Sequence, residues 1–212
     1  MNIKKLIKGN KRFREAKFTQ YKDDFKTLVE HGQKPNILFI GCSDSRVVPD
    51  LIVDSKPGDM FLMRNIGNFV PPFKDDFDFH GVSAVIEYAV SVLKVKDIIV
   101  CGHTHCGACA SLYEDLSTNK KLIHVRKWLE LGQKAKEYAL LNLLNKKSSK
   151  EQLLRTTEKI SVAYQLENLL TYPEVAKRIK KGKLNIHGWF YDIEDGSIEV
   201  YNPKKAKYKK LK

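Results

Sequence analysis

The chain has 212 residues, of which 42% are hydrophobic and 30% are charged, so it can bury the core of one domain spanning residues 1–212. No apolar run is long enough to cross a bilayer, and the lysine-rich start lacks the apolar segment of an export signal. The net charge of +13 comes from basic runs without aromatic stacking partners, which argues against specific nucleic-acid binding. The four cysteines are sparse, and three of them lie within residues 101–109, a pattern that favours metal ligands in a reducing compartment. We therefore expect a cytoplasmic protein without nucleic-acid or membrane partners.

The first 34 residues predict a helical arm with little apolar surface. One helix is expected over residues 2–16 and a second over residues 21–32, where Tyr21, Phe25 and Leu28 share one side. These apolar stripes are too thin to support helices standing alone. We expect the arm, residues 1–34, to lie across a larger body such as a partner subunit.

The next hundred residues alternate strand and helix signals. Near-continuous apolar runs predict strands at residues 36–42, 59–65 and 97–103, of the kind buried on both faces of a parallel sheet. Apolar residues at helical spacing predict an amphipathic helix over residues 77–94, and Pro57-Gly58 punctuates the segment between the first two strands. This alternation predicts an α/β fold with a mainly parallel central sheet flanked by helices.

The remaining sequence predicts helices followed by a hairpin. The Asp195-Gly196 pair is a hairpin signal between strands at about residues 183–193 and 197–202, so antiparallel strands should complete the sheet. Residues 203–212 read as a basic, solvated tail with six lysines in its last nine positions. The expected helices cover about residues 121–145, 150–171 and 174–181.

The sequence "CSDSR" follows the first strand directly. If the chain stays extended there, Cys42, Asp44 and Arg46 lie on one side, with Ser43 and Ser45 facing away. Ligands in open α/β sheets collect at the carboxyl ends of the strands. A thiolate, a carboxylate and a guanidinium are therefore expected to share one pocket.

A second polar cluster, "CGHTHCGAC", leaves the third strand. His103 and Cys106 are three residues apart, so on a first helical turn both would project to one face, and a helix N-terminus favours a thiolate. Together with Cys42 they form a Cys, His, Cys set of the kind that selects zinc. Three protein ligands leave one position open, which is typical of a catalytic zinc.

The other members of this cluster have competing interpretations. Cys101 reads as an apolar strand residue, Cys109 as a packing residue that could also coordinate, and His105 as a surface or supporting residue. Cys101, Cys106 and Cys109 also have the C-x4-C-x2-C spacing of plant-type ferredoxins. The fourth cysteine lies far upstream and the context is strand then helix, which disfavours an iron–sulfur cluster.

The combination C-x-D-x-R followed by H-x-x-C resembles the β class of carbonic anhydrases. The resemblance extends through "RNIGNFVPP", "GVSAVIEYAV", "NLLTYP" and "HGWFYDI", so it covers nearly the whole chain. It implies reversible hydration of CO2 to bicarbonate and a proton by a zinc-bound hydroxide. It also implies that Cys42, His103 and Cys106 bind one Zn²⁺ per subunit, and that Asp44 and Arg46 form a catalytic pair.

These implied roles are chemically consistent. Zinc lowers the pKa of bound water to about 7, which provides a nucleophile at neutral pH. Asp44 can accept the hydrogen of that nucleophile, and a forked contact from Arg46 keeps the carboxylate ionised and off the metal. In some family members the aspartate instead swings onto the zinc and closes the site.

The resemblance further implies a plant-like substrate pocket, lined by Gln33, Phe61, Ile66 and Tyr88. Phe39 stands where the bicarbonate-inhibited kind has tryptophan, so the regulatory bicarbonate site is expected to be absent. For Phe61 and Ile66, plain core packing is an equally good interpretation. In the family the pocket is completed across a dimer interface, which implies a homodimer or tetramer.

Two other functions remain compatible with the motifs. A zinc hydrolase of the same fold could act on a similar linear molecule such as carbon disulfide. A non-catalytic zinc protein could sense bicarbonate. The presence of both Asp44 and Arg46 argues against the sensor, because a purely structural zinc site needs neither of them.

Overall fold

The computed structural model describes residues 1–211 and shows one sheet surrounded by helices. Within these residues the sheet has six strands in the order β2-β1-β3-β4-β5-β6. The pairs β2–β1, β1–β3 and β3–β4 are parallel, whereas β4–β5 and β5–β6 are antiparallel. This arrangement confirms the predicted fold class. The strands are β1 (Ile37–Cys42), β2 (Met60–Asn65), β3 (Asp97–His103), β4 (Asn185–Tyr191), β5 (Ile198–Asn202) and β6 (Lys207–Lys210).

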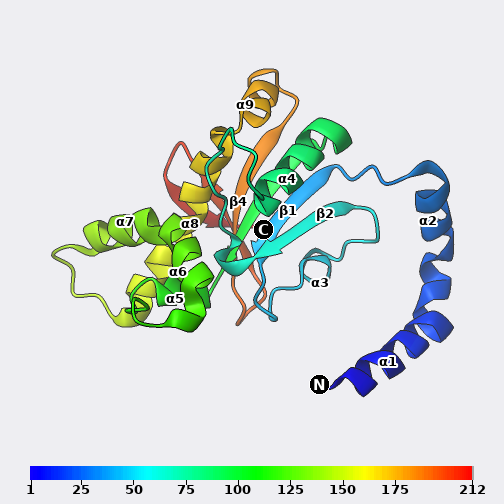
Figure 1. Cartoon of the computed structure of the whole chain (residues 1–212), viewed down its shortest axis with the longest axis horizontal. Coiled ribbons are helices and arrows are strands. Elements are labelled where there is room, and N and C mark those ends of the chain that lie inside the picture. Colours follow the sequence, from blue (N-terminus) through cyan, green and yellow to red (C-terminus); the bar gives the residue numbers. More distant parts are fainter. Residues whose placement is uncertain (212) are drawn as a thin grey trace.

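Helices pack around the sheet and form an arm at the N-terminus (Figure 1). None of the helices in the described part of the chain is both long and apolar enough to cross a membrane. The α-helices are α1 (Ile3–Arg12), α2 (Phe18–His31), α3 (Pro49–Val53), α4 (Gly81–Glu87), α5 (Gly107–Ser111), α6 (Ile123–Leu129), α7 (Gln133–Leu143), α8 (Lys150–Leu170) and α9 (Pro173–Lys180).

The central strands β1 and β3 are buried almost throughout, as their apolar runs predict. Leu38 and Ile40 of β1 join Ile98 and Val100 of β3 in the larger core cluster, which side chains of α4, α8 and α9 complete. Phe39 of β1 belongs to a smaller cluster with Ile99 and Cys101 of β3. Since β1 and β3 are parallel neighbours, their carboxyl ends lie side by side and hold both polar clusters at one edge.

Helix α8 crosses the sheet closely because a glycine on β3 makes room for it. The helix begins with a capping box, in which the Ser149 hydroxyl accepts from the Gln152 amide at 3.1 Å and the Gln152 side chain accepts in return at 2.9 Å. A Cβ atom added to Gly102 would lie 2.4 Å from Cγ2 of Val162. A side chain at position 102 would therefore push α8 away from the strand.

The two helices predicted for the N-terminal arm are confirmed as α1 and α2, but they follow each other without a break. A π-helical turn (Phe13–Lys17) joins α1 to α2, because no glycine, proline or cap breaks the chain between them. The arm ends at Gly32, whose φ of 73° only glycine adopts freely. None of the arm's helical residues is buried, and the arm stands apart from the sheet (Figure 1).

Two predicted helices are shorter or divided. The helix expected over residues 77–94 begins at Gly81, because the side chains of Asp76 and Asp78 accept hydrogen bonds from the following backbone amides and hold a loop. Phe77 on this loop is fully exposed. The helix expected over residues 121–145 is divided into α6 and α7 by a 3-10 turn (Glu130–Gly132).

The predicted basic tail contains a strand, so the expectation of a wholly solvated tail over residues 203–212 is wrong. Strand β6 pairs with β5, with Tyr208 opposite Tyr201. The Tyr208 ring packs edge-on against Phe190, and its hydroxyl donates to the backbone oxygen of Lys159 at 2.7 Å. One partly buried aromatic side chain thus anchors a lysine-rich segment. Lys212 lies outside the described residues.

Candidate metal and catalytic site

Three metal-binding side chains meet at the carboxyl ends of β1 and β3. Cys42 ends β1, His103 ends β3, and Cys106 immediately precedes α5. Their potential ligand atoms all lie within 4.8 Å of one another. All three residues are buried, with exposed fractions of 6%, 1% and 3%. The sequence-predicted zinc ligands are therefore brought together by the pairing of two parallel strands.

His103 and Cys106 do not share the first turn of a helix, so that part of the prediction is wrong. Strand β3 continues through His103, and Cys106 is the N-cap of α5 in an extended conformation, with φ of −70° and ψ of 115°. Between them His105 adopts a left-handed conformation with φ of 58°. This reversal, rather than helical spacing, turns Cys106 back toward His103.

The His103 ring is oriented as a metal ligand. Its Nδ1 lies 2.8 Å from the backbone oxygen of Thr104, an interaction that places the ring hydrogen on Nδ1. Its Nε2 is buried and has no hydrogen-bond partner among residues 1–211. A buried nitrogen lone pair facing two thiols is poorly satisfied by protein alone. The three donors fit a zinc ion, which accepts this mixture of sulfur and nitrogen ligands.

Hydrogen bonding and burial disfavour the ionisation of both cysteine ligands. Hydrogen bonding to Cys106 and burial raise the pKa of Cys42 to about 12. Hydrogen bonding to Cys109 and burial likewise raise the pKa of the Cys106 thiol. A divalent cation reverses this preference because it stabilises two adjacent thiolates.

Asp44 and Arg46 form a bidentate ion pair beside the metal-binding group. Nε of Arg46 lies 2.9 Å from Oδ1 of Asp44, and Nη2 lies 2.7 Å from Oδ2. The Arg46 backbone amide also donates to Oδ1 at 3.0 Å, so the chain turns here instead of staying extended as predicted. The guanidinium holds the pKa of Asp44 well below its usual range. The carboxylate is therefore ionised at neutral pH.

Arg64, on β2, also contributes to the site, although its sequence position did not predict this. Its Nε donates to the backbone oxygen of Cys42 at 2.8 Å, and its Nη2 donates to that of Asp44 at 2.6 Å. It thereby fixes the segment that carries the first ligand and the carboxylate. The available signal was a lone arginine at the carboxyl end of a strand adjacent to β1.

A cavity of about 300 Å³ opens beside Cys42 and Asp44. Ile66 lines it, whereas Gln33, Phe61 and Tyr88 do not. The rings of Phe61 and Tyr88 instead pack against each other with centroids 5.8 Å apart. Its other lining residues are Ser43, Gly67, Gly107, Ala108, Ser111, Val125 and Leu129.

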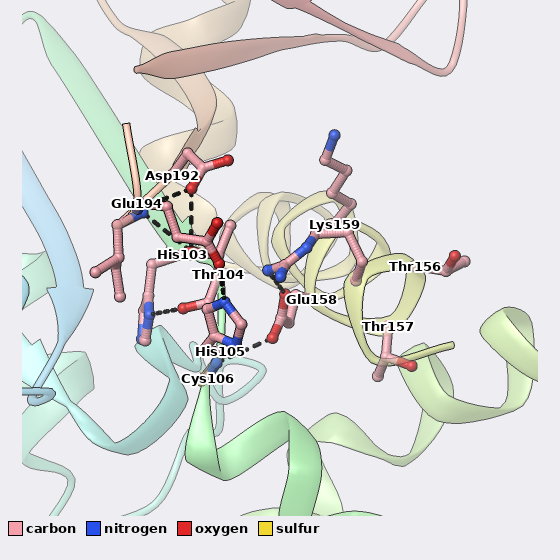
Figure 2. A network of polar contacts seen from close by, with 12 residues as sticks. His103, Thr104, His105, Cys106, Thr156, Thr157, Glu158, Lys159, Asp192 and Glu194 are labelled. Atoms are coloured by element: carbon pink, nitrogen blue, oxygen red, sulfur yellow. Dashed lines mark hydrogen bonds and ion pairs between the residues drawn. The ribbon is translucent and has the colours of Figure 1, made fainter. Parts of the chain in front are cut away.

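The remaining residues of the "CGHTHCGAC" segment have supporting positions. Cys101 is fully buried in β3 and Cys109 is buried in α5, and neither belongs to the metal-binding group. This placement contradicts the ferredoxin-like alternative. His105 is partly exposed, and its Nε2 lies 2.7 Å from Oε1 of Glu194 (Figure 2). The His105 backbone oxygen accepts from Nη2 of Arg46 at 3.0 Å, which links the two polar clusters.

Comparison with known proteins agrees with this geometry. A protein-family model described as "Carbonic anhydrase" matches residues 37–198. A carbonic anhydrase of Synechocystis sp. is 41% identical over 200 residues, covering 94% of this chain and 71% of that protein. A carbonic anhydrase of Pseudomonas aeruginosa is 38% identical over 209 residues, covering 99% of this chain and 92% of that protein.

Solved structures agree as well. The β-carbonic anhydrase CcaA superposes with a TM-score of 0.91 at 39% identity, covering 99% of this chain and 92% of that chain. A tetrameric β-carbonic anhydrase from the filamentous ascomycete Sordaria macrospora superposes with a TM-score of 0.79 at 33% identity, covering 92% and 94%. The chain belongs to the β class of the carbonic anhydrase family, whose members are zinc enzymes that interconvert CO2 and bicarbonate.

Proposed function

We propose that Asp44 and Arg46 are the catalytic pair of CO2 hydration at a zinc held by Cys42, His103 and Cys106. The observation that carries this assignment is the bidentate contact between Asp44 and Arg46, at the edge of the cavity that Cys42 also lines. When bound, zinc supplies a Lewis acid that lowers the pKa of a coordinated water to about 7.

Asp44 is oriented to accept a hydrogen from the attacking group. Its Oδ1 already accepts from both Nε and the backbone amide of Arg46, whereas Oδ2 accepts from Nη2 alone. Oδ2 therefore keeps a free lone pair that can accept the hydrogen of the attacking hydroxyl group. This contact would turn a lone pair of the hydroxyl oxygen toward CO2. Arg46 keeps the carboxylate ionised and restrains it from binding the metal.

The cavity suits a small molecule without a dipole. Ile66, Val125 and Leu129 provide apolar walls, which exclude water and leave room for CO2. Position 39 holds phenylalanine where the bicarbonate-inhibited kind has tryptophan, which supports the plant-like subtype without a regulatory bicarbonate site. In this subtype Gln33, Phe61 and Tyr88 complete the pocket.

A second copy of the chain would bring those three residues to the metal. Gln33 is exposed at the end of the arm and Tyr88 is 45% exposed, so both are available to a partner. The arm also leaves Ile3, Leu6 and Ile7 of α1 exposed. A structural relative from Sordaria macrospora is described as tetrameric. We infer a cytoplasmic homodimer or tetramer in which each arm covers its neighbour.

Stopped-flow CO2 hydration by zinc-loaded wild type, Cys106→Ser and Asp44→Asn tests the proposal. Wild type should show a zinc-dependent rate, Cys106→Ser should lose both bound zinc and the rate, and Asp44→Asn should keep zinc and lose the rate. Turnover of carbon disulfide without turnover of CO2 would reassign the substrate. Bicarbonate binding without any turnover would identify a sensor.

A further inference from the structure

Glu158 is a buried carboxylate that the proposed reaction does not use. It lies on α8, is 3% exposed, and sits directly behind the metal-binding group. Its Oε1 accepts the backbone N–H of Cys106 at 2.9 Å (Figure 2). Its Oε2 lies 2.6 Å from Nη1 of Arg155. A carboxylate is costly to bury, and here both oxygens are satisfied by specific partners.

The Cys106 amide has few alternatives to this contact. Cys106 is the N-cap of α5, and an N-cap amide lies outside the hydrogen bonds of its own helix. The preceding residue, His105, is left-handed, so the chain direction changes immediately before the ligand. The Glu158 carboxylate supplies an acceptor where the local chain would otherwise leave a buried donor unpaired.

The turn between His103 and Cys106 is held from several sides, but one side chain contacts the ligand residue's own amide. Arg46 donates to the backbone oxygen of His105 at 3.0 Å, and the Thr104 hydroxyl accepts from the Ile193 amide at 3.0 Å. Among residues 1–211, Glu158 is the one residue whose side chain forms a hydrogen bond with the backbone of Cys106. Glu158 therefore restrains the backbone of the residue that carries the sulfur.

Arg155 fixes Glu158 in turn. Arg155 precedes Glu158 by three residues on α8, and its guanidinium carbon lies 6.0 Å from the centre of the Phe190 ring. The pair is thus built on one helix and stacked against the sheet. Arg155 thus holds Glu158 in one rotamer, which keeps its carboxyl group at a defined position beside the metal site.

We propose that Glu158 is a positioning residue for zinc, which fixes the Cys106 ligand through its backbone amide and is itself held by Arg155. The proposal rests on the assignment of Cys106 as a ligand. Groups that orient metal ligands typically change metal affinity by about 10- to 100-fold when removed. The effect should therefore appear in zinc binding itself.

The test compares Glu158→Leu, which removes the acceptor, with Glu158→Gln, which keeps an amide oxygen as acceptor. Zinc affinity is measured by competition with a chelator, and Co²⁺-substituted proteins are compared by their thiolate charge-transfer and visible absorption bands. Glu167→Gln is the matched control, because Glu167 is an exposed carboxylate on the same helix.

Glu158→Leu should bind zinc about 10- to 100-fold more weakly than wild type and shift the Co²⁺ bands. Glu158→Gln should stay within about threefold of wild type, because the hydrogen bond to Cys106 survives. Wild-type affinity and bands in Glu158→Leu would overturn the proposal, as would equal weakening in both variants. If Glu158→Leu does not fold, Arg155→Met must weaken zinc binding to support the proposal. Undiminished zinc binding by Cys106→Ser would instead refute the ligand assignment.

Discussion

Arg46 holds Asp44 by two parallel hydrogen bonds, from Nε to Oδ1 at 2.9 Å and from Nη2 to Oδ2 at 2.7 Å. The same Nη2 donates to the backbone oxygen of His105 at 3.0 Å. One guanidinium therefore connects the loop after β1, which carries Cys42, with the turn after β3, which carries Cys106. The orientation of the carboxylate and the shape of the metal site depend on each other.

Replacing the carboxylate should stop catalysis without emptying the metal site. In Asp44→Asn an amide NH2 group can take the place of a hydrogen-bond acceptor, so we expect kcat/KM for CO2 hydration to fall by about 10²- to 10⁴-fold. Bound zinc, measured by atomic emission, should remain at one per subunit. Asp75→Asn, which alters an exposed loop carboxylate, is the control and should retain full activity. A fully active Asp44→Asn would remove Asp44 from the mechanism.

Zinc binding should depend steeply on pH. The pKa values of Cys42, at about 12, and of Cys106 are raised in the metal-free protein, so both thiols are protonated at neutral pH. Zinc binds the thiolates, so each binding event releases about two protons and the apparent affinity rises about 100-fold per pH unit. Chelator competition between pH 7 and pH 8 measures this slope. A pH-independent affinity would show that the thiols are already ionised or do not bind the metal.

Gln33 should act on the zinc of the neighbouring subunit. Gln33→Ala and Cys106→Ser are each expected to be impaired as homodimers, but a mixed dimer has one site with an intact metal group and an intact glutamine. Co-expression with different affinity tags should yield about half mixed dimers and hence about a quarter of wild-type activity.

Sedimentation of the mixture confirms that dimers are present. If Gln33 served its own subunit, the mixed dimers would show no activity beyond that of the two parent variants. A monomeric and fully active wild type would exclude a shared site altogether.

The close contact of β3 with α8 predicts a specific loss of stability. In Gly102→Ala the new methyl group would meet Cγ2 of Val162 at 2.4 Å, so the free energy of unfolding should fall by about 1–3 kcal/mol. Gly81→Ala is the control, because no atom lies within 4 Å of its added Cβ. Urea unfolding monitored by circular dichroism measures both. Equal stabilities would mean that α8 shifts without cost.

The sequence was sufficient to predict the parallel sheet and the positions of the metal ligands at its edge, because both depend on the pattern and order of the strands. The apolar runs at residues 36–42 and 97–103 predict buried parallel strands, and parallel strands bring their carboxyl ends together. That reasoning places Cys42 near His103 without any detailed geometry. It also predicts the antiparallel C-terminal strands from the Asp195-Gly196 signal.

The conformations of the site loops could not be predicted from local sequence. The turn at Arg46 is stabilised by its own contact with Asp44, and the left-handed His105 is held by Arg46 and Glu194, which lie far away in the chain. Arg64 was missed for the same reason, since its role depends on reaching across from β2. Strand β6 was not predicted because lysines dominate its composition. The aromatic contacts that anchor it in the sheet are made by one residue, Tyr208.

The order of the strands also constrains when the metal can enter. Cys42 and His103 lie on either side of α3, β2 and α4 in the chain, and they meet because β1 and β3 pair along their length. The unfolded chain does not hold these two ligands together, so the complete site exists only when the two strands have paired. A zinc ion bound there would stabilise the folded chain, because it binds the folded state in preference to the unfolded one. The metal centre would then also act as a clasp across the middle of the sheet.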